Sequence, residues 1–246
     1  MDIGVFDHLD RRNVPLDEHY ASRLRLLERY DAAGFAAYHL AEHHATPLGM
    51  APAPGIFLAA ATQRTRRIRL GPCVYCLPLY DPLRLIEEIC MLDQMSHGRF
   101  DLGVGRGIVP YEMAYFDLHP FETEEIYREA LEVILAGLTN DVLEHRGPRY
   151  TYRKVPMVLK PFQKPHPPIW YGLAHERGAE WAATNGVHVL TNHPAEGATE
   201  PRSPRSLGSK TSPVSGRNRR LRPKRRDDGK VTRRDGHRDL RPPRPS

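Results

Sequence analysis

Six short apolar segments, separated by stretches with helical spacing, constrain the fold of this chain more than any other feature. We expect strands at residues 1–6, 35–40, 68–78, 99–104, 169–173 and 187–191. We expect helices at residues 17–33, 55–63, 82–95, 123–138 and 176–184, and an irregular connection over residues 139–168. Strands that alternate with helices pair in parallel through right-handed crossovers. The pattern therefore predicts an α/β protein built on a parallel sheet.

Local signals at the helix ends agree with this alternation. Gly34 follows the first helical stretch and can adopt the left-handed conformation that ends a helix. Asp81 and Pro82 are a typical helix start, since an aspartate caps free N–H groups and proline suits the first helical position. These signals place the helix boundaries without reference to tertiary contacts.

The segment 92–107, LDQMSHGRFDLGVGRG, ends a helix, forms the fourth strand and finishes in Gly105-Arg106-Gly107. Two glycines beside an arginine allow the backbone to approach a ligand closely next to a permanent cation. In barrels of alternating strands and helices, ligands bind at such strand ends. Arg106 is therefore either an anion clamp, most plausibly for a phosphate, or a solvated arginine in a tight turn.

Glu42-His43-His44 follows the second strand and is the most concentrated titratable cluster of residues 1–200. Histidine suits proton transfer near neutral pH, although two histidines on a polar loop have the same pattern. His39 to His43 also fits H-x-x-E-H, a zinc peptidase pattern that requires both histidines on one helix. Because residues 35–40 are expected to form a strand, we predict no metal here.

Two glycine-containing turns suggest further anion sites. Gly103-x-Gly105-x-Gly107 lacks the spacing of the dinucleotide fingerprint, so we exclude a Rossmann domain. The turn from Gly172 through Ala174 and His175 leads into a helix, whose first free N–H groups favour an anion. Such turns are common, so this signal is weak by itself.

Three cysteines, an odd number, argue against a disulfide framework, and Cys73 and Cys76 form a lone CxxC without a second pair for zinc. No apolar run is long enough to span a membrane. The first residues are too short and too acidic for a signal peptide, so we expect a cytoplasmic protein.

The last part of the chain differs sharply in composition. Residues 201–246 hold 16 Lys and Arg against 4 Asp and Glu, whereas residues 1–200 hold 20 against 26. The tail also has seven prolines and no Phe, Trp or Tyr, so it cannot bury enough apolar surface to offset its ordering entropy. We therefore expect one folded domain over residues 1–194 and a disordered tail over residues 195–246.

Two explanations of this tail differ in what they predict. The abrupt loss of the strand–helix pattern near Pro194 suggests a shifted reading frame or a misassembled gene. Alternatively, its basic clusters neutralise nucleic-acid phosphates, but no aromatic residue is available for base stacking. A nucleic-acid partner is therefore the weaker expectation.

Several motifs together resemble the bacterial-luciferase-like flavin monooxygenases. They comprise the spacing from Phe35 and His39 to Ala41-Glu42-His43-His44, Ile68-Arg69-Leu70-Gly71 with Leu77-Pro78, the whole 92–107 segment, and Pro167-Pro168-Ile169-Trp170. The resemblance covers about residues 1–193 and implies a TIM (β/α)8-type barrel, here truncated to about six βα units. It also implies reduced FMN supplied by a separate flavin reductase, dioxygen, a small organic substrate and dimers.

The same resemblance assigns residues to roles. His43 is the proton-handling catalytic residue, supported by Glu42 and His44. The cofactor-binding residues that it implies are Arg106, Gly105, Gly107, Cys73, Val74, Tyr75, Ala174 and His175, with a cis peptide bond between Cys73 and Val74. Two alternatives stay open: hydride transfer with the deazaflavin F420, and an inactive flavin-binding remnant.

Overall fold

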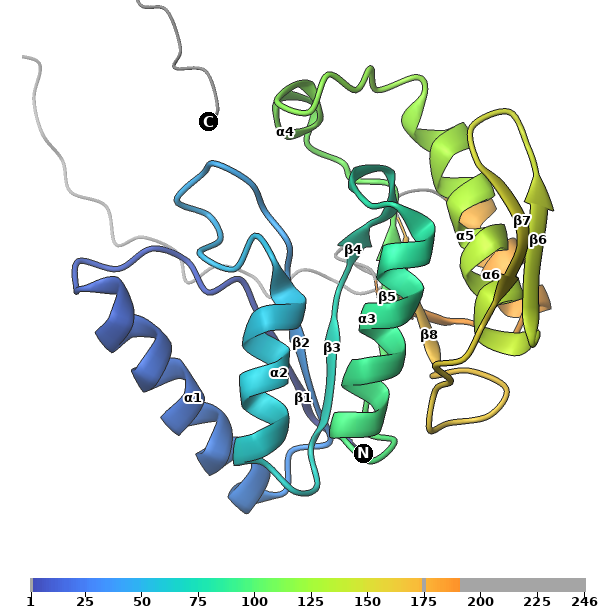
Figure 1. Cartoon of the computed structure of the whole chain (residues 1–246). Helices are drawn as coiled ribbons and strands as arrows, with labels where there is room; N and C mark the ends of the chain where they lie inside the picture. Colours follow the sequence, from blue (N-terminus) through green and yellow to red (C-terminus); the bar gives the residue numbers. More distant parts are fainter. Residues whose placement is uncertain (1, 174–175, 191–246) are drawn as a thin grey trace, which may run out of the picture. The chain divides into compact units, whose positions relative to one another are not determined.

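The structure is a computed structural model that describes residues 2–173 and 176–190. Strands and helices alternate along most of this part of the chain (Figure 1). The expected tail, residues 195–246, lies outside the described residues. The elements are β1 (Gly4–Asp7), α1 (Leu16–Ala33), β2 (Ala37–Leu40), α2 (Pro54–Arg64), β3 (Arg69–Pro72), β4 (Tyr75–Cys76), a 3₁₀ turn (Leu77–Leu79), α3 (Pro82–Met95), β5 (Leu102–Gly105), α4 (Pro110–Ala114), α5 (Thr123–Thr139), β6 (Val142–Arg146), β7 (Thr151–Pro156), β8 (Ile169–Gly172), α6 (Glu176–Thr184) and β9 (His188–Leu190).

The expected parallel sheet is confirmed. Strands β1, β2 and β3 pair in parallel in that order, and β4, β5, β8 and β9 form a second parallel series. A parallel bridge between Leu70 and Phe100 connects the two series. The third expected strand is divided into β3 and β4 at Cys73 and Val74, whose peptide bond is cis, as the resemblance implies. The truncation of the barrel to about six βα units stays a prediction.

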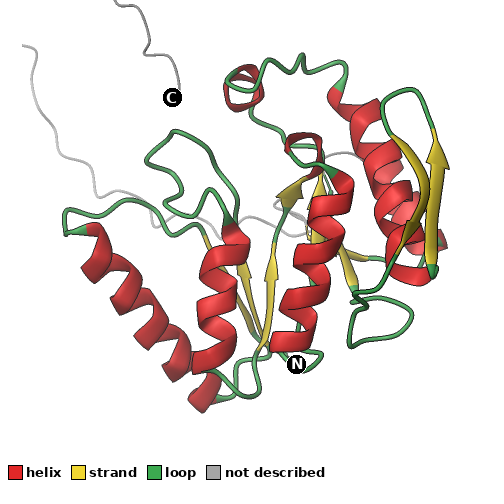
Figure 2. Cartoon of the chain, in the orientation of Figure 1, coloured by secondary structure: helices red, strands yellow, loops and turns green. Residues whose placement is uncertain are grey.

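Helices α1, α2 and α3 lie side by side in front of the strands (Figures 1 and 2). Their apolar sides and the facing strand residues form one buried core, with Leu58, Ile86, Ile89 and Phe100 fully buried. Burial of such side chains is the main favourable contribution to folding. This core holds the strands in fixed positions relative to one another.

The helix ends follow the local signals of the sequence. Gly34 has the left-handed conformation (φ +83°) and its N–H donates to carbonyl groups at the end of α1. The Asp81 side chain accepts a hydrogen bond from the Arg84 N–H, with Pro82 at the first position of α3. Both predicted boundaries are confirmed.

The expectation of an irregular connection over residues 139–168 is wrong in part. Strands β6 and β7 form an antiparallel hairpin there, next to α5 (Figure 1). Its turn is held by Glu129 of α5, whose carboxylate accepts the N–H groups of Arg149 and Tyr150 and contacts His145 at 3.2 Å. This anchor is about twenty residues away along the chain, so a local pattern does not reveal it. In the described part, no helix is long and apolar enough to cross a membrane.

Candidate functional site

The predicted site residues lie at the carboxyl ends of neighbouring strands. Glu42, His43 and His44 follow β2, and Gly105-Arg106-Gly107 ends and follows β5. Between these strands, Cys73, Val74 and Tyr75 lie where β3 passes into β4. Parallel strands end at one edge of their sheet, so these segments all lie at that edge. Ala174 and His175 lie outside the described residues.

His43 is held by a carboxylate that the sequence did not point to. Its Nδ1 lies 3.0 Å from Oε1 of Glu112, and the Glu112 side chain is 2% exposed. Glu112 belongs to α4, a five-residue helix that begins at Pro110, three residues after Gly107. A carboxylate at Nδ1 orients the ring and leaves Nε2 as the nitrogen for proton exchange. The buried pair links the end of β2 to the segment that follows Arg106.

The buried carboxylate of Glu42 is the centre of a second group, whose other members are partly buried. Its Oε1 lies 3.0 Å from Nε2 of His44, and its Oε2 accepts a hydrogen bond of 2.6 Å from the Tyr80 hydroxyl. Burial, followed by the charge of Glu42, raises the pKa of Tyr80, so this phenol stays protonated and donates. Glu42 is therefore satisfied inside the protein and supports the loop that carries His43 and His44.

Arg106 is partly free for a ligand. Its side chain is 33% exposed, and its ion pair with Glu124 at the start of α5 is long, at 3.9 Å. Glu124 makes a shorter contact of 2.9 Å with Arg128, which competes for the same carboxylate. Burial and Glu124 raise the pKa of Tyr171 on β8, whereas the nearby charge of Arg106 opposes this effect. Arg106 thus lies at the end of β5, next to the start of α5.

The glycines beside Arg106 have a packing function. A Cβ on Gly105 would lie 2.5 Å from Cγ2 of Val74, and one on Gly107 would lie 2.8 Å from Cε of Met113. Gly107 also has a positive φ of +78°. These glycines allow close approach of Val74 and Met113; their contact with a ligand stays a prediction.

The residues at the junction of β3 and β4 differ in access. Tyr75 is fully buried and its hydroxyl donates to Glu88 of α3 at 2.7 Å, so its side chain is not available to a ligand. Cys73 is also buried, and burial raises the pKa of its thiol to about 12. Val74 is partly exposed, and its side chain lies against Gly105 and Gly172. Val74 is therefore the side chain of this group best placed for a ligand.

The geometry does not fit the zinc peptidase pattern. His39 lies on β2 and its Nε2 is 3.0 Å from Oδ2 of Asp101, whereas His43 contacts a different carboxylate, Glu112. Asp101 is also bound by Arg69 and is 1% exposed. His39 is thus a packed structural residue, with Trp170 edge-on at 4.7 Å.

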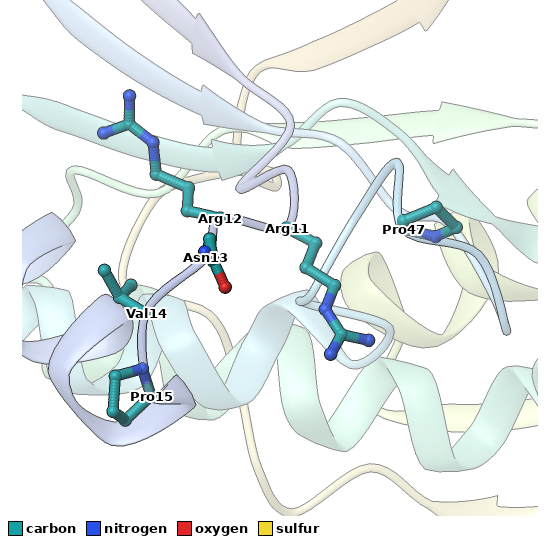
Figure 3. A pocket seen from close by; sticks show the side chains of 6 residues that line it. All are labelled: Arg11, Arg12, Asn13, Val14, Pro15 and Pro47. Carbon is teal, nitrogen blue, oxygen red and sulfur yellow. The ribbon is translucent and has the colours of Figure 1, made fainter.

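An open hollow of about 440 Å³ lies beside this edge and is lined by Arg11, Arg12, Asn13, Val14, Pro15 and Pro47. Figure 3 shows that the guanidinium groups of Arg11 and Arg12 point away from each other. None of the predicted site residues that the structure describes lines it. Because the two cations do not converge, this hollow is a surface feature of the loops after β1 and β2.

Among relatives, the chain is 47% identical over 192 residues to the uncharacterized protein y4wF of Sinorhizobium fredii, covering 78% of this chain and 56% of that protein. It is 29% identical over 193 residues to the oxygenase component of the flavin-dependent trigonelline monooxygenase of Acinetobacter baylyi, covering 77% and 53%. The chain thus spans about half the length of these curated relatives.

Solved structures share the fold. The monooxygenase RslO1 of Streptomyces bottropensis matches with a TM-score of 0.73 and 31% identity, covering 77% of this chain and 59% of that one. The oxygenating constituent of 3,6-diketocamphane monooxygenase from Pseudomonas putida, in complex with FMN, matches with a TM-score of 0.71 and 19% identity, covering 78% and 57%. An F420-dependent secondary alcohol dehydrogenase matches with a TM-score of 0.65 and 23% identity, covering 77% and 57%.

The sequence model of the luciferase-like monooxygenases matches residues 1–204, which include every described strand and helix. The order of the strands, the cis bond before β4, and the histidines and arginine at the strand ends agree with the motifs that suggested this assignment. The chain therefore belongs to the luciferase-like monooxygenase family.

Proposed function

We propose that this chain carries the flavin-binding part of a monooxygenase that uses reduced FMN and dioxygen to oxygenate a small organic molecule. Family membership supports an oxidoreductase, and the relative from Acinetobacter baylyi is named as the oxygenase component of a flavin-dependent enzyme. That name supports a separate flavin reductase as the partner. Because the chain spans about half of its relatives, the activity of the whole protein is part of the proposal.

The observation that carries this proposal is the contact between His43 and the buried carboxylate of Glu112. A histidine whose Nδ1 is held at 3.0 Å by a carboxylate keeps one tautomer and one ring orientation. Its Nε2 can then give or accept a proton at a bound ligand. Glu42 and His44 support this role by fixing the loop after β2 through Tyr80.

The residues at the end of β5 fit the phosphate of FMN. Arg106 presents guanidinium donors that a long ion pair leaves available, which is the donor type that best matches a phosphate. We assign the backbone of Gly105, Gly107, Cys73, Val74 and Tyr75, together with Ala174 and His175, as further cofactor contacts. Bound reduced FMN would supply the electrons for the reaction with dioxygen, while His43 handles protons beside it.

The experiment that tests this proposal is a binding and turnover assay on the purified full chain. We expect FMN to bind, and we expect added reduced FMN and a flavin reductase system to give oxygen consumption that the His43→Gln variant slows without losing FMN affinity. Binding of F420 in preference to FMN would favour hydride transfer instead. A folded chain that binds neither cofactor would overturn the proposal and favour an inactive remnant.

A further inference from the structure

A second imidazole, His8, lies against His43 at the carboxyl end of β1. We propose that His8 is the uncharged partner of His43, a positioning residue that keeps the exchangeable proton of the pair on His43. This inference rests on the role of His43 in the proposed function, because it states how that residue's proton is placed. Neither the family motifs nor the sequence spacing point to His8.

The two rings are stacked. Their centroids lie 5.4 Å apart and their planes differ by 12°. Phe6 also packs edge-on against His8, with ring centroids 5.0 Å apart. Gly49 brings the loop after β2 against this pair, since a Cβ there would lie 3.1 Å from Cβ of His43 and 3.2 Å from the carbonyl oxygen of His8. The packing of Phe6 and Gly49 therefore restricts the relative position of the two rings.

The surroundings of the two rings assign the proton to one of them. In a charged imidazole both nitrogens carry hydrogens that need acceptors. Nδ1 of His8 is buried and has no hydrogen-bond partner among the described residues, whereas Nδ1 of His43 faces Glu112. A proton on Nδ1 of His8 would be a buried donor without an acceptor, which is costly. The proton therefore resides on His43, between the stacked ring and Glu112.

The charges that face His8 shift its pKa in opposite directions. Burial and the charge of His43 lower the pKa of His8, whereas Asp7 and Asp10 raise it. Both aspartates are already engaged, since Arg23 of α1 contacts Asp7 at 3.2 Å and Asp10 at 3.3 Å. Asp7 also accepts a hydrogen bond from the Tyr38 hydroxyl. The net effect lowers the pKa of His8 and favours its neutral form.

The pair therefore holds its exchangeable proton on one ring in place of both. A neutral stacked ring holds His43 in plane without adding a second positive charge that would repel it. Replacing His8 should change the titration of the pair even where the fold is unaffected, which a purely structural role would not do.

The test is an NMR titration of the histidine rings in the full chain, with the His8 signal assigned by its loss in His8→Gln. We expect the midpoint of His8 to move upward in His43→Phe, which keeps the stacked ring but removes the charge. We expect it to move downward in Asp10→Asn, and to be unchanged in the control His44→Phe. Retention of the dispersed His39 signal shows that each variant is folded, and Glu112→Gln, which lowers the charge on His43, replaces His43→Phe if that variant unfolds.

A His8 that titrates at or above its usual value of 6.5, or whose midpoint does not respond to His43→Phe or Glu112→Gln, would overturn this inference. The titration uses no flavin. A chain with a coupled histidine pair but no FMN affinity would therefore contradict the proposed function alone, and the reverse result would contradict the His8 inference alone.

Discussion

Replacing Arg106 by glutamine is the most direct test of the phosphate site. A hydrogen bond to a charged group contributes about 1.5–3 kcal/mol. Because the Arg106 side chain is 33% exposed, solvent weakens this interaction, and we expect the lower end of the range. That corresponds to roughly a tenfold weaker binding of FMN, measured as quenching of flavin fluorescence at fixed ionic strength.

Two comparisons make the result specific. Riboflavin lacks the phosphate, so its affinity should be the same in the wild-type chain and in Arg106→Gln. Arg128→Gln is the matched control, because Arg128 contacts the same Glu124 at 2.9 Å but is 75% exposed on α5. We expect this control to leave FMN affinity within about a factor of two, as for most exposed ion pairs.

Two outcomes would contradict a role of Arg106 in phosphate binding. If Arg106→Gln weakens riboflavin as much as FMN, the arginine supports the local structure and does not bind the phosphate. If Arg106→Gln and Arg128→Gln behave alike, the effect comes from the general charge around Glu124. Either result would move the phosphate site away from the end of β5.

Three further predictions concern stability and reactivity. Asp101→Ala should lower the free energy of unfolding by about 3 kcal/mol in urea titrations, because it leaves Arg69 and the buried His39 without their carboxylate, whereas exposed Asp141→Ala should change it by less than about 0.5 kcal/mol. Burial and the charge of His43 hold the pKa of His8 below 6.5, so the unfolded chain binds a proton at His8 before the folded chain does, and the wild-type chain loses stability as the pH falls through 6.5. The His8→Gln variant should therefore gain stability relative to the wild type when the pH is lowered from 7.5 to 5.5. An identical pH dependence of the two proteins would contradict this. All cysteines of the chain are buried, and burial raises the pKa of the Cys73 thiol to about 12, so a thiol reagent at pH 8 should react only after urea unfolds the protein, and prompt labelling would refute the burial of Cys73, Cys76 and Cys90.

Much of the fold could be predicted because its signals are local. The apolar segments, the glycine after α1 and the Asp-Pro start of α3 are each recognised within a few residues, and parallel pairing follows from their alternation. The hairpin of β6 and β7 could not be found in this way, since its turn depends on Glu129 in the preceding helix.

The candidate site could also be predicted only in part. His43 and Arg106 are visible in the sequence because each lies within three residues of the end of a strand, and such positions share one edge of a parallel sheet. Glu112 could not be found, because α4 has only five residues and its carboxylate contacts a histidine 69 residues earlier in the chain.

By itself, the sequence determined the order of strands and helices and which residues follow each strand, since these depend on hydrophobic periodicity and on the conformational preferences of glycine, proline and aspartate. The tertiary structure alone decided which charges those residues meet. Glu112 at His43, Tyr80 at Glu42 and the ring of His8 at His43 come together only when separate loops fold over the same sheet edge, and this packing gives each of these groups its partner.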